Sequence, residues 1–303
     1  MTDLRGTWYI SPTPFTAAGE VDTDSMAGVV TAAATWGVDG ITILGVMGEV
    51  ADLTAAERGA VLTAASQAAA GVVPFAVGCS APSAAVVTDN IARAVDAGAA
   101  AVMVSAPTLL KDTDQIAAFY RAATAGCPVP VIVQDEPAAT GVTMPVSALI
   151  AALDASGSSV VKLEDPPTPP KITRLLAQRP DLTVFGGLGG VSAYSEMLRG
   201  AAGTMTGFAY PEILRAIRLA FEAGNRAAAA TINDRFLPYL VFEGQQRVGL
   251  GIRKEVLRRR GVIADARTRA LNPYADAATL DELNDVLARV GLEPSAAALD
   301  VTA

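Results

Sequence analysis

The sequence alternates short apolar runs with longer alanine-rich runs, and glycines punctuate this alternation at nearly regular intervals. Successive glycines that follow the alanine-rich runs are separated by 34, 27, 28 and 31 residues; they are Gly37, Gly71, Gly98, Gly126 and Gly157. Glycine is typical of the position just after a helix, because it adopts the left-handed conformation without a steric penalty. Since strand–helix–strand units occupy about 30 residues, the spacing predicts a series of such units.

Eight runs have the length and composition of strands. They are Thr7–Ser11, Gly40–Leu44, Val73–Gly78, Ala100–Ser105, Val129–Gln134, Ser159–Leu163, Leu182–Phe185 and Gly203–Thr206. Each is continuously apolar rather than alternating, which is typical of parallel strands covered on both faces. Eight strand–helix units in a chain of 303 residues predict a (β/α)8 TIM barrel of the α/β class. A doubly wound open sheet is the alternative, although Gly45-Val46-Met47-Gly48 is not a dinucleotide-binding fingerprint.

Helix-capping signals support the helices between these runs. Thr54 and Glu57 have the spacing of a capping box, and Thr168 followed by Pro169 suits an N-cap and a first helical position. After residue 206 no further strand is evident, and helices are expected at 211–224, 226–239, 248–260 and 279–290. We therefore expect one structural unit, with the barrel over 1–210 and the last barrel helix and a C-terminal helical extension over 211–303.

Charge and composition exclude several classes of function. Lys and Arg number 23 against 31 Asp and Glu, and the net charge of −8 argues against a nucleic-acid-binding or anionic-membrane-binding protein. The N-terminal residues lack the apolar stretch of a signal peptide and no apolar run is long enough to span a bilayer, so we expect a cytoplasmic protein. Cys79 and Cys127 form no metal-binding or disulfide pattern and are expected to be core thiols.

The sequence contains no histidine. This absence excludes catalysis by Ser-His-Asp or Cys-His groups, His-ligated metal sites and histidine acid–base chemistry. Any catalysis must therefore use lysine, tyrosine, carboxylates, hydroxyls, backbone amides or a cofactor.

Lys162 lies within the apolar run 159–163, directly before Glu164-Asp165-Pro166-Pro167. A lysine in a valine-rich strand needs a buried partner or a chemical role, because an ammonium group is costly to remove from water. Burial disfavours the charged form of an amine and favours the nucleophilic neutral form, which makes imines with carbonyl compounds. A strand-end lysine whose ammonium group reaches solvent is the structural alternative.

Active sites of (β/α)8 barrels lie at the carboxyl ends of the strands. The candidate site residues at these ends are Thr13, Gly45, Val46, Met47, Gly48, Gln134, Lys162, Glu164, Met205, Thr206 and Gly207. The turn from Gly45 to Glu49 can direct successive backbone N–H groups at an anion such as a substrate carboxylate, unless it is a plain strand–helix turn. The glycine-rich run 186–190 is a weaker candidate for a binding loop, because glycine-rich loops are common after strands.

Several short motifs occur in a fixed order along the chain. They are Pro12-Thr13-Pro14-Phe15, Gly45-x-x-Gly48-Glu49, Leu53-Thr54-x-x-Glu57-Arg58, Pro137 with Thr140-Gly141, Val161-Lys162 and Gly203-Thr204-Met205. By these motifs the chain resembles the dihydrodipicolinate synthase/N-acetylneuraminate lyase superfamily, from Gly6 to the C-terminal helices. The resemblance implies that Lys162 forms an imine with a 2-keto acid and that the turn Gly45–Gly48 holds its carboxylate. It also implies a homo-oligomer, a tetramer or a dimer.

The chain departs from the common members of this superfamily at several positions. Gln134 stands where they have a tyrosine, and Val46 and Met47 stand where they have hydroxyl residues. Ala139 stands where dihydrodipicolinate synthases have the arginine that binds a second carboxylate. We therefore expect neither a synthase that uses aspartate semialdehyde nor an ordinary sialic acid lyase.

The segments Gln134-Asp135-x-Pro137, Lys162-x-Glu164-x-Pro166 and Met205-Thr206-Gly207 look like those of 2-keto-3-deoxy sugar-acid dehydratases, notably 2-keto-3-deoxy-L-arabonate dehydratase. This resemblance implies an imine at C2, loss of a C3 proton, expulsion of the C4 hydroxyl and hydrolysis to a 2-keto acid semialdehyde. No metal or organic cofactor is expected, because the iminium itself withdraws electrons. Glu164, Thr206 or a water held by Gln134 would act as acid–base group, unless Glu164 merely neutralises a protonated Lys162.

Two other functions are compatible with the sequence. A pyruvate-dependent aldolase or hydratase-aldolase would use the same lysine, and the apolar side chains of Val46 and Met47 would suit a hydrophobic aldehyde. A non-catalytic barrel that binds keto acids is suggested by the missing tyrosine.

The remaining charged residues near these motifs are expected to face solvent. Asp135 and Glu136 are interpreted as solvent-facing loop charges, with catalysis as the alternative. The basic residues Arg253, Lys254, Arg258, Arg259 and Arg260 are interpreted as a solvated helix face, from which one side chain could reach the rim of the pocket.

Overall fold

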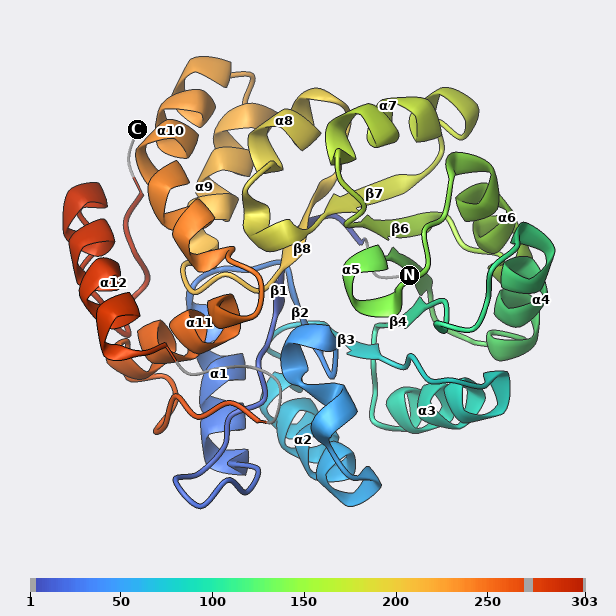
Figure 1. Ribbon diagram of the computed structural model, residues 1–303, viewed down its shortest axis with the longest axis horizontal. Coiled ribbons are helices and arrows are strands. Elements are labelled where there is room, and N and C mark those ends of the chain that lie inside the picture. The colour runs from blue at the N-terminus through green and yellow to red at the C-terminus, as the bar shows by residue number, and fades with distance from the viewer. Residues whose placement is uncertain (1–3, 270–274, 302–303) are drawn as a thin grey trace.

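The computed structural model describes residues 4–269 and 275–301 of the chain. Within these ranges, parallel strands close into a barrel in the order in which they occur in the sequence, and helices surround it (Figure 1). The strands are β1 Gly6–Ile10, β2 Gly40–Ile43, β3 Phe75–Gly78, β4 Ala101–Ser105, β5 Val131–Asp135, β6 Val160–Leu163, β7 Thr183–Gly186 and β8 Gly203–Thr206. The predicted (β/α)8 barrel is confirmed, and the open-sheet alternative is wrong.

The barrel helices alternate with the strands. They are α1 Thr23–Thr35, α2 Ala55–Ala69, α3 Ala84–Asp96, α4 Thr113–Ala123, α6 Val146–Ser156, α7 Thr168–Gln178, α8 Ala193–Leu198 and α9 Pro211–Glu222. A further short helix, α5 (Pro137–Thr140), was not predicted and lies between β5 and α6. Short 3₁₀ helices follow two of the strands: η1 (Val46–Gly48) and η2 (Val50–Asp52) after β2, and η3 (Leu188–Gly190) after β7.

The predicted C-terminal helical extension is also confirmed. It consists of α10 (Arg226–Glu243), α11 (Val248–Arg259) and α12 (Ala277–Val290), which lie together on one side of the barrel (Figure 1). Helix α10 packs on both α9 and α12. Among the described residues, no helix is long and apolar enough to cross a membrane.

Most of the predicted helix-end signals are observed. Thr54 and Glu57 form the capping box, since each side chain accepts a hydrogen bond from the backbone N–H of the other. The five regularly spaced glycines all have φ between 63° and 85°, the left-handed region that glycine tolerates best. The prediction for Thr168 is wrong by one residue. Pro167 is the N-cap, and the buried Thr168 hydroxyl instead donates to Glu196 Oε1 at 2.5 Å.

The interior of the barrel is a packed core. Side chains from seven strands fill it: Trp8, Ile10, Ala76, Ala101, Met103, Ile132, Val160, Phe185 and Met205. The large indole of Trp8 fits because Gly40 is its register partner on β2. A Cβ atom at position 40 would lie 2.6 Å from the Trp8 ring. Chemistry must therefore take place above this layer, at the carboxyl ends of the strands.

Strand register places the polar residues in a row above the apolar layer. Ser105 on β4 pairs with Gln134 on β5, which pairs with Lys162 on β6. Ile132 and Val160, two residues earlier on β5 and β6, belong to the interior cluster. Because side chains alternate along a strand, Gln134 and Lys162 face the interior as well.

The two cysteines have different environments. Both are free thiols, but only Cys79 is buried, and Cys127 is partly exposed. The expectation of two core thiols is therefore wrong for Cys127, which packs at the edge of the outer core. Burial raises the pKa of both thiols, so neither is a reactive thiolate near neutral pH.

The contact between Trp8 and Gly40 generates a stability prediction. Gly40→Ala is expected to lower the free energy of unfolding by about 1–3 kcal/mol, because the rigid indole must shift within a filled core. The matched control is Gly59→Ala in α2, where an added Cβ meets nothing within 4 Å. That change should leave stability unchanged or raise it by about 0.5–1 kcal/mol. Urea unfolding of both variants gives the comparison, and equal midpoints would contradict the packing argument.

Candidate active site

Lys162 and two other predicted catalytic residues meet at the carboxyl end of β6. The Lys162 side chain is buried, with the residue only 3% exposed, so its ammonium group does not reach solvent. Lys162 Nζ lies 2.6 Å from Glu164 Oε2, and Gln134 Nε2 donates to the same oxygen at 3.0 Å. The structure thus brings together an amine, a carboxylate and an amide, all three buried.

The loop after β7 fixes the position of the Glu164 carboxylate. The backbone N–H of Leu188 donates to Glu164 Oε1 at 3.4 Å. Leu188 has a φ of 48°, a conformation that is strained for a leucine. Gly187 is needed here, because a Cβ at this position would lie 2.4 Å from Glu164 Cγ. The glycine-rich run 186–190 therefore holds Glu164 beside Lys162.

Thr206 and Met205 on β8 make no hydrogen bond to Lys162, Glu164 or Gln134 within the described residues. The Thr206 hydroxyl accepts a hydrogen bond from the Gly189 N–H at 3.0 Å, so it anchors the same glycine-rich loop. Met205 points into the barrel and belongs to the interior cluster. The guanidinium of Arg253 lies close to the backbone of the adjacent Gly207, since a Cβ there would lie 2.7 Å from Arg253 Nη1.

The turn after β2 is shaped by two strained residues. Leu44 has a φ of 55° and Glu49 a φ of 52°, and 3₁₀ helix η1 lies between them. The N–H groups of Gly48 and Glu49 bond within the turn, to Gly45 O at 2.9 Å and Val46 O at 3.0 Å. As the first residues of a helix, Val46 and Met47 have N–H groups with no acceptor within it. These two amides, rather than a longer series, are the ones available to an anion.

Thr13 and Met47 join this turn to the barrel. Thr13 Oγ1 donates to Gly48 O at 2.6 Å, and both residues are buried. The Met47 side chain packs on the interior cluster, whereas Val46 is 47% exposed. A Cβ at Gly45 would stand 3.4 Å from Met103 Cε, so Gly45 lies against the interior cluster. The predicted binding residues of β1 and β2 therefore form one wall of the barrel mouth.

A buried ion pair connects this wall to the C-terminal extension. Lys254 Nζ lies 2.5 Å from Glu49 Oε1, and both side chains are fully buried. Burial lowers the pKa of Lys254, although the Glu49 carboxylate opposes that shift. Arg253 and Arg260 are buried as well, paired with Glu243 and Glu212. The expected solvated basic face is therefore wrong for Lys254, Arg253 and Arg260, because each has a carboxylate partner from another element.

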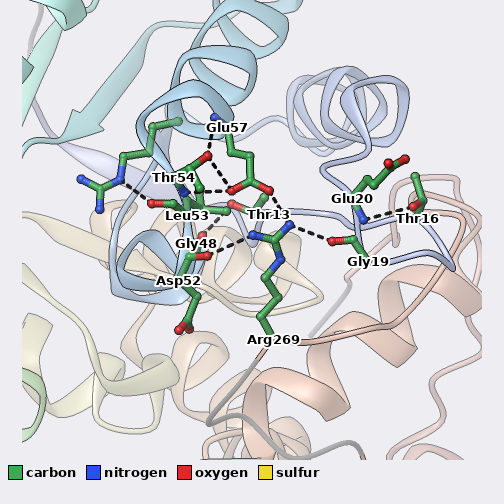
Figure 2. Close-up of polar contacts among 11 residues, drawn as sticks. Thr13, Thr16, Gly19, Glu20, Gly48, Asp52, Leu53, Thr54, Glu57 and Arg269 are labelled. Atoms are coloured by element: carbon green, nitrogen blue, oxygen red, sulfur yellow. Dashed lines mark hydrogen bonds and ion pairs between the residues drawn. The ribbon is translucent and has the colours of Figure 1, made fainter.

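Arg269 is a residue of this wall that sequence reasoning missed. Its backbone N–H donates to Glu49 Oε2 at 2.6 Å. Its guanidinium donates to Asp52 O at 3.0 Å, Gly19 O at 2.7 Å and Glu57 Oε1 at 2.6 Å, as Figure 2 shows for the side chain. Arg269 thus ties the segment after α11 to the turn after β2. No local pattern marks it, because its partners are more than 200 positions away in the sequence.

Asp135 is the last residue of β5 and Glu136 follows it, and the two carboxylates differ in their exposure. Asp135 is fully buried and pairs with Lys171 Nζ at 2.5 Å. Burial raises the pKa of Asp135 to about 6 despite this ammonium group. Glu136 is half-buried, and its side chain accepts a hydrogen bond from the Ala139 N–H at 2.9 Å as the N-cap of α5. The expectation of exposure is wrong for Asp135, whose long-range partner Lys171 the sequence did not reveal.

The Arg269–Glu57 contact predicts a pH dependence of stability. The pKa of Glu57 is lowered to about 2, and the hydrogen bond from Arg269 is the largest cause. A lowered folded-state pKa adds stability above the ordinary value of 4.5, and this stability is lost as pH falls toward 2. Glu57→Gln should therefore cost up to about 1 kcal/mol at neutral pH, after solvent screening, and almost nothing at pH near 2.

Urea unfolding as a function of pH measures this difference. The exposed Glu20, drawn beside the cluster in Figure 2, provides the control variant Glu20→Gln. The free energy of unfolding of that variant should equal that of wild type at every pH. A Glu57→Gln protein that also parallels wild type at every pH would show that the contact contributes nothing.

Comparison with known proteins gives one consistent family. The chain matches the model of the dihydrodipicolinate synthetase family over residues 3–289. It is 30% identical over 293 residues to the L-2-keto-3-deoxyarabonate dehydratase of Azospirillum brasilense, and the match covers 94% of each protein. It is 30% identical over 269 residues to the 4-hydroxy-tetrahydrodipicolinate synthase of Porphyromonas gingivalis, covering 86% of this chain and 88% of the synthase.

A solved structure supports the same assignment. The dihydrodipicolinate synthase of Rhodopseudomonas palustris superimposes with a TM-score of 0.89 at 35% identity, covering 94% of this chain and 97% of the other. Since the family match also spans nearly the whole chain, this protein belongs to the dihydrodipicolinate synthetase family, a family of lyases.

Proposed function

We propose that this protein dehydrates a 2-keto-3-deoxy sugar acid through an imine between Lys162 and C2 of the substrate. The observation that carries the proposal is the buried group of Lys162, Glu164 and Gln134, with Glu164 Oε2 within 2.6 Å of the amine and 3.0 Å of the amide. An amine at the bottom of a barrel mouth with a carboxylate in contact is suited to covalent catalysis.

Glu164 has two roles in this proposal. It first accepts a proton from Lys162, because only the neutral amine attacks a carbonyl carbon. Glu164 passes this proton to the hydroxyl of the carbinolamine, which leaves as water and gives the iminium. The carboxylate, now free again, removes the proton from C3, and the iminium takes up the electrons as an enamine. The enamine then expels the hydroxyl group on C4. In a pentonate, proton shifts from C5 to C3 and from the C5 hydroxyl to C4 convert the unsaturated iminium into a semialdehyde, and hydrolysis releases it from Lys162. These steps require no metal or organic cofactor, because the protonated imine supplies the positive charge.

The substrate carboxylate is assigned to the turn after β2. The N–H groups of Val46 and Met47 are free of intrahelical bonds, and oriented amides favour anions. Thr13 and Arg269 hold the turn through Gly48 and Glu49. Strain stored at Leu44 and Glu49 is typical of sites where backbone geometry matters for function.

Dehydration is favoured over the synthase reaction by what surrounds Lys162. An amide, Gln134, occupies the position beside the lysine, and an amide is no acid–base group at neutral pH. Ala139 on α5 stands where dihydrodipicolinate synthases have an arginine, and its methyl group cannot bind a second carboxylate. The similarity to the A. brasilense dehydratase extends over nearly the full chain, although relatives named as synthases are equally identical.

A pyruvate-dependent aldolase is the second candidate. One wall of the mouth supports it, since Met47 packs on the apolar interior cluster and Val46 is exposed beside it. An apolar wall suits a hydrophobic aldehyde. The same imine would then break a carbon–carbon bond instead of a carbon–oxygen bond.

Reduction by borohydride tests imine formation. In the presence of pyruvate, wild-type protein should gain a covalent adduct that peptide mass spectrometry locates on Lys162. Lys162→Ala should show no adduct, whereas the exposed Lys111 provides a control, and Lys111→Ala should be labelled like wild type. A folded wild-type protein without adduct would favour a non-catalytic barrel and exclude both enzyme candidates.

Product analysis separates the two enzyme candidates. Incubation with a set of 2-keto-3-deoxy pentonates and hexarates should give a 2-keto acid semialdehyde or its homologue, and no pyruvate. Lys162→Ala should lose this activity by several orders of magnitude. Release of pyruvate and an aldehyde would instead identify an aldolase.

A further inference from the structure

A second carboxyl group, Glu136, lies at the barrel mouth next to Glu164. The pairing of β5 and β6 continues past the strand ends, since the Glu164 N–H donates to Asp135 O at 2.8 Å. Register therefore places Glu136 beside Glu164, each two residues beyond the pair Gln134 and Lys162. Glu136 directly follows β5, with a φ of −135° and a ψ of 80°. Since side chains alternate along a strand, its side chain shares the inward face with Gln134.

One oxygen of the Glu136 carboxyl group accepts a hydrogen bond, and the other accepts none from the described residues. Its Oε2 accepts the Ala139 N–H at 2.9 Å, which fixes the side chain as the N-cap of α5. Within the described residues no hydrogen bond occupies Oε1. In Figure 1, α5 lies between the labels of β4 and β6, over the ring of strands. Glu136 is half-buried, so its free oxygen can meet a substrate that enters the mouth.

The charges around Glu136 favour its protonated form. Burial is the main cause that raises its pKa to about 7, and the Glu164 carboxylate adds to the shift. Lys162 and the Ala139 N–H oppose it, and Asp135 contributes weakly in the same direction as Glu164. A carboxyl group with such a pKa can donate a proton at neutral pH, which an ordinary glutamate cannot.

We propose that Glu136 is the general acid that protonates the C4 hydroxyl as it leaves, in partnership with Glu164 as the base at C3. This inference rests on the proposed function and adds the acid that the sequence lacks where relatives have a tyrosine. Gln134 then orients Glu164 and takes no part in proton transfer.

The step balances in atoms and electrons. Glu164 takes the C3 proton, and the electrons of the C3–H bond form the enamine between C2 and C3. As the enamine returns to an iminium, a C3–C4 double bond forms and the C4–O bond breaks. The hydroxyl leaves with the proton of Glu136 as water. A proton passed from Glu164 to the neighbouring Glu136 restores both groups, and nothing is oxidised or reduced.

Glu136→Gln tests the assignment, because the amide oxygen can still accept the Ala139 N–H and preserve α5. With a 2-keto-3-deoxy sugar acid that wild type dehydrates, kcat should fall by about 100-fold or more. The loss of rate that wild type shows as pH rises through about 7 should disappear in the variant. Glu136→Asp should recover part of the activity. Glu282→Gln on the exposed face of α12 is the matched control and should behave as wild type.

A substrate analogue separates an acid from a merely structural residue. Fluoride at C4 leaves without a proton, so Glu136→Gln should eliminate it at nearly the wild-type rate. Borohydride trapping of pyruvate on Lys162 should also be unchanged. A variant that dehydrates the hydroxy acid normally, or that fails equally with the fluoro analogue, would overturn the role of Glu136 alone. Wild type that dehydrates no 2-keto-3-deoxy acid would overturn the proposed function and this inference with it.

Discussion

The buried ion pair between Lys162 and Glu164 is the interaction on which the barrel mouth depends. Two charged groups removed from water are rarely a source of net stability, and loss of one leaves the other uncompensated. The surrounding residues are arranged accordingly. Gln134 donates to the carboxylate from β5, and the glycine-rich loop after β7 contributes the Leu188 N–H. The proposed chemistry explains why such a costly pair is retained, since it provides a nucleophile and a base in contact.

A second buried pair, between Lys254 and Glu49, couples the extension to the barrel. Lys254 belongs to α11, and Glu49 ends the turn that is proposed to hold the substrate carboxylate. Arg269 completes this connection through Glu49 and Glu57. The barrel thus supplies Lys162, while Lys254 and Arg269 of the C-terminal part contribute contacts to the strained turn after β2.

The sequence predicted most of the fold because the relevant signals are local. Continuous apolar runs located all eight strands to within two residues, and the regular glycines marked helix ends. It also indicated Lys162, because a lysine inside a valine-rich run is unusual in itself. It failed for α5, a helix of four residues too short for any periodicity. It failed as well for Asp135, Lys254 and Arg260, which were expected in solvent.

Those failures share a physical reason. Whether a charged side chain is buried depends on a partner, and the partners here lie far apart in sequence: Lys171 is 36 positions from Asp135, and Lys254 is 205 positions from Glu49. By itself the sequence determined the (β/α)8 architecture, the imine-forming candidate and the absence of histidine chemistry. Only the tertiary structure decided that Glu136 lies beside Glu164, because the register of β5 and β6 aligns them. It also decided that Arg269 holds the turn after β2, because the chain folds back onto the barrel after α11 and no local pattern connects these groups.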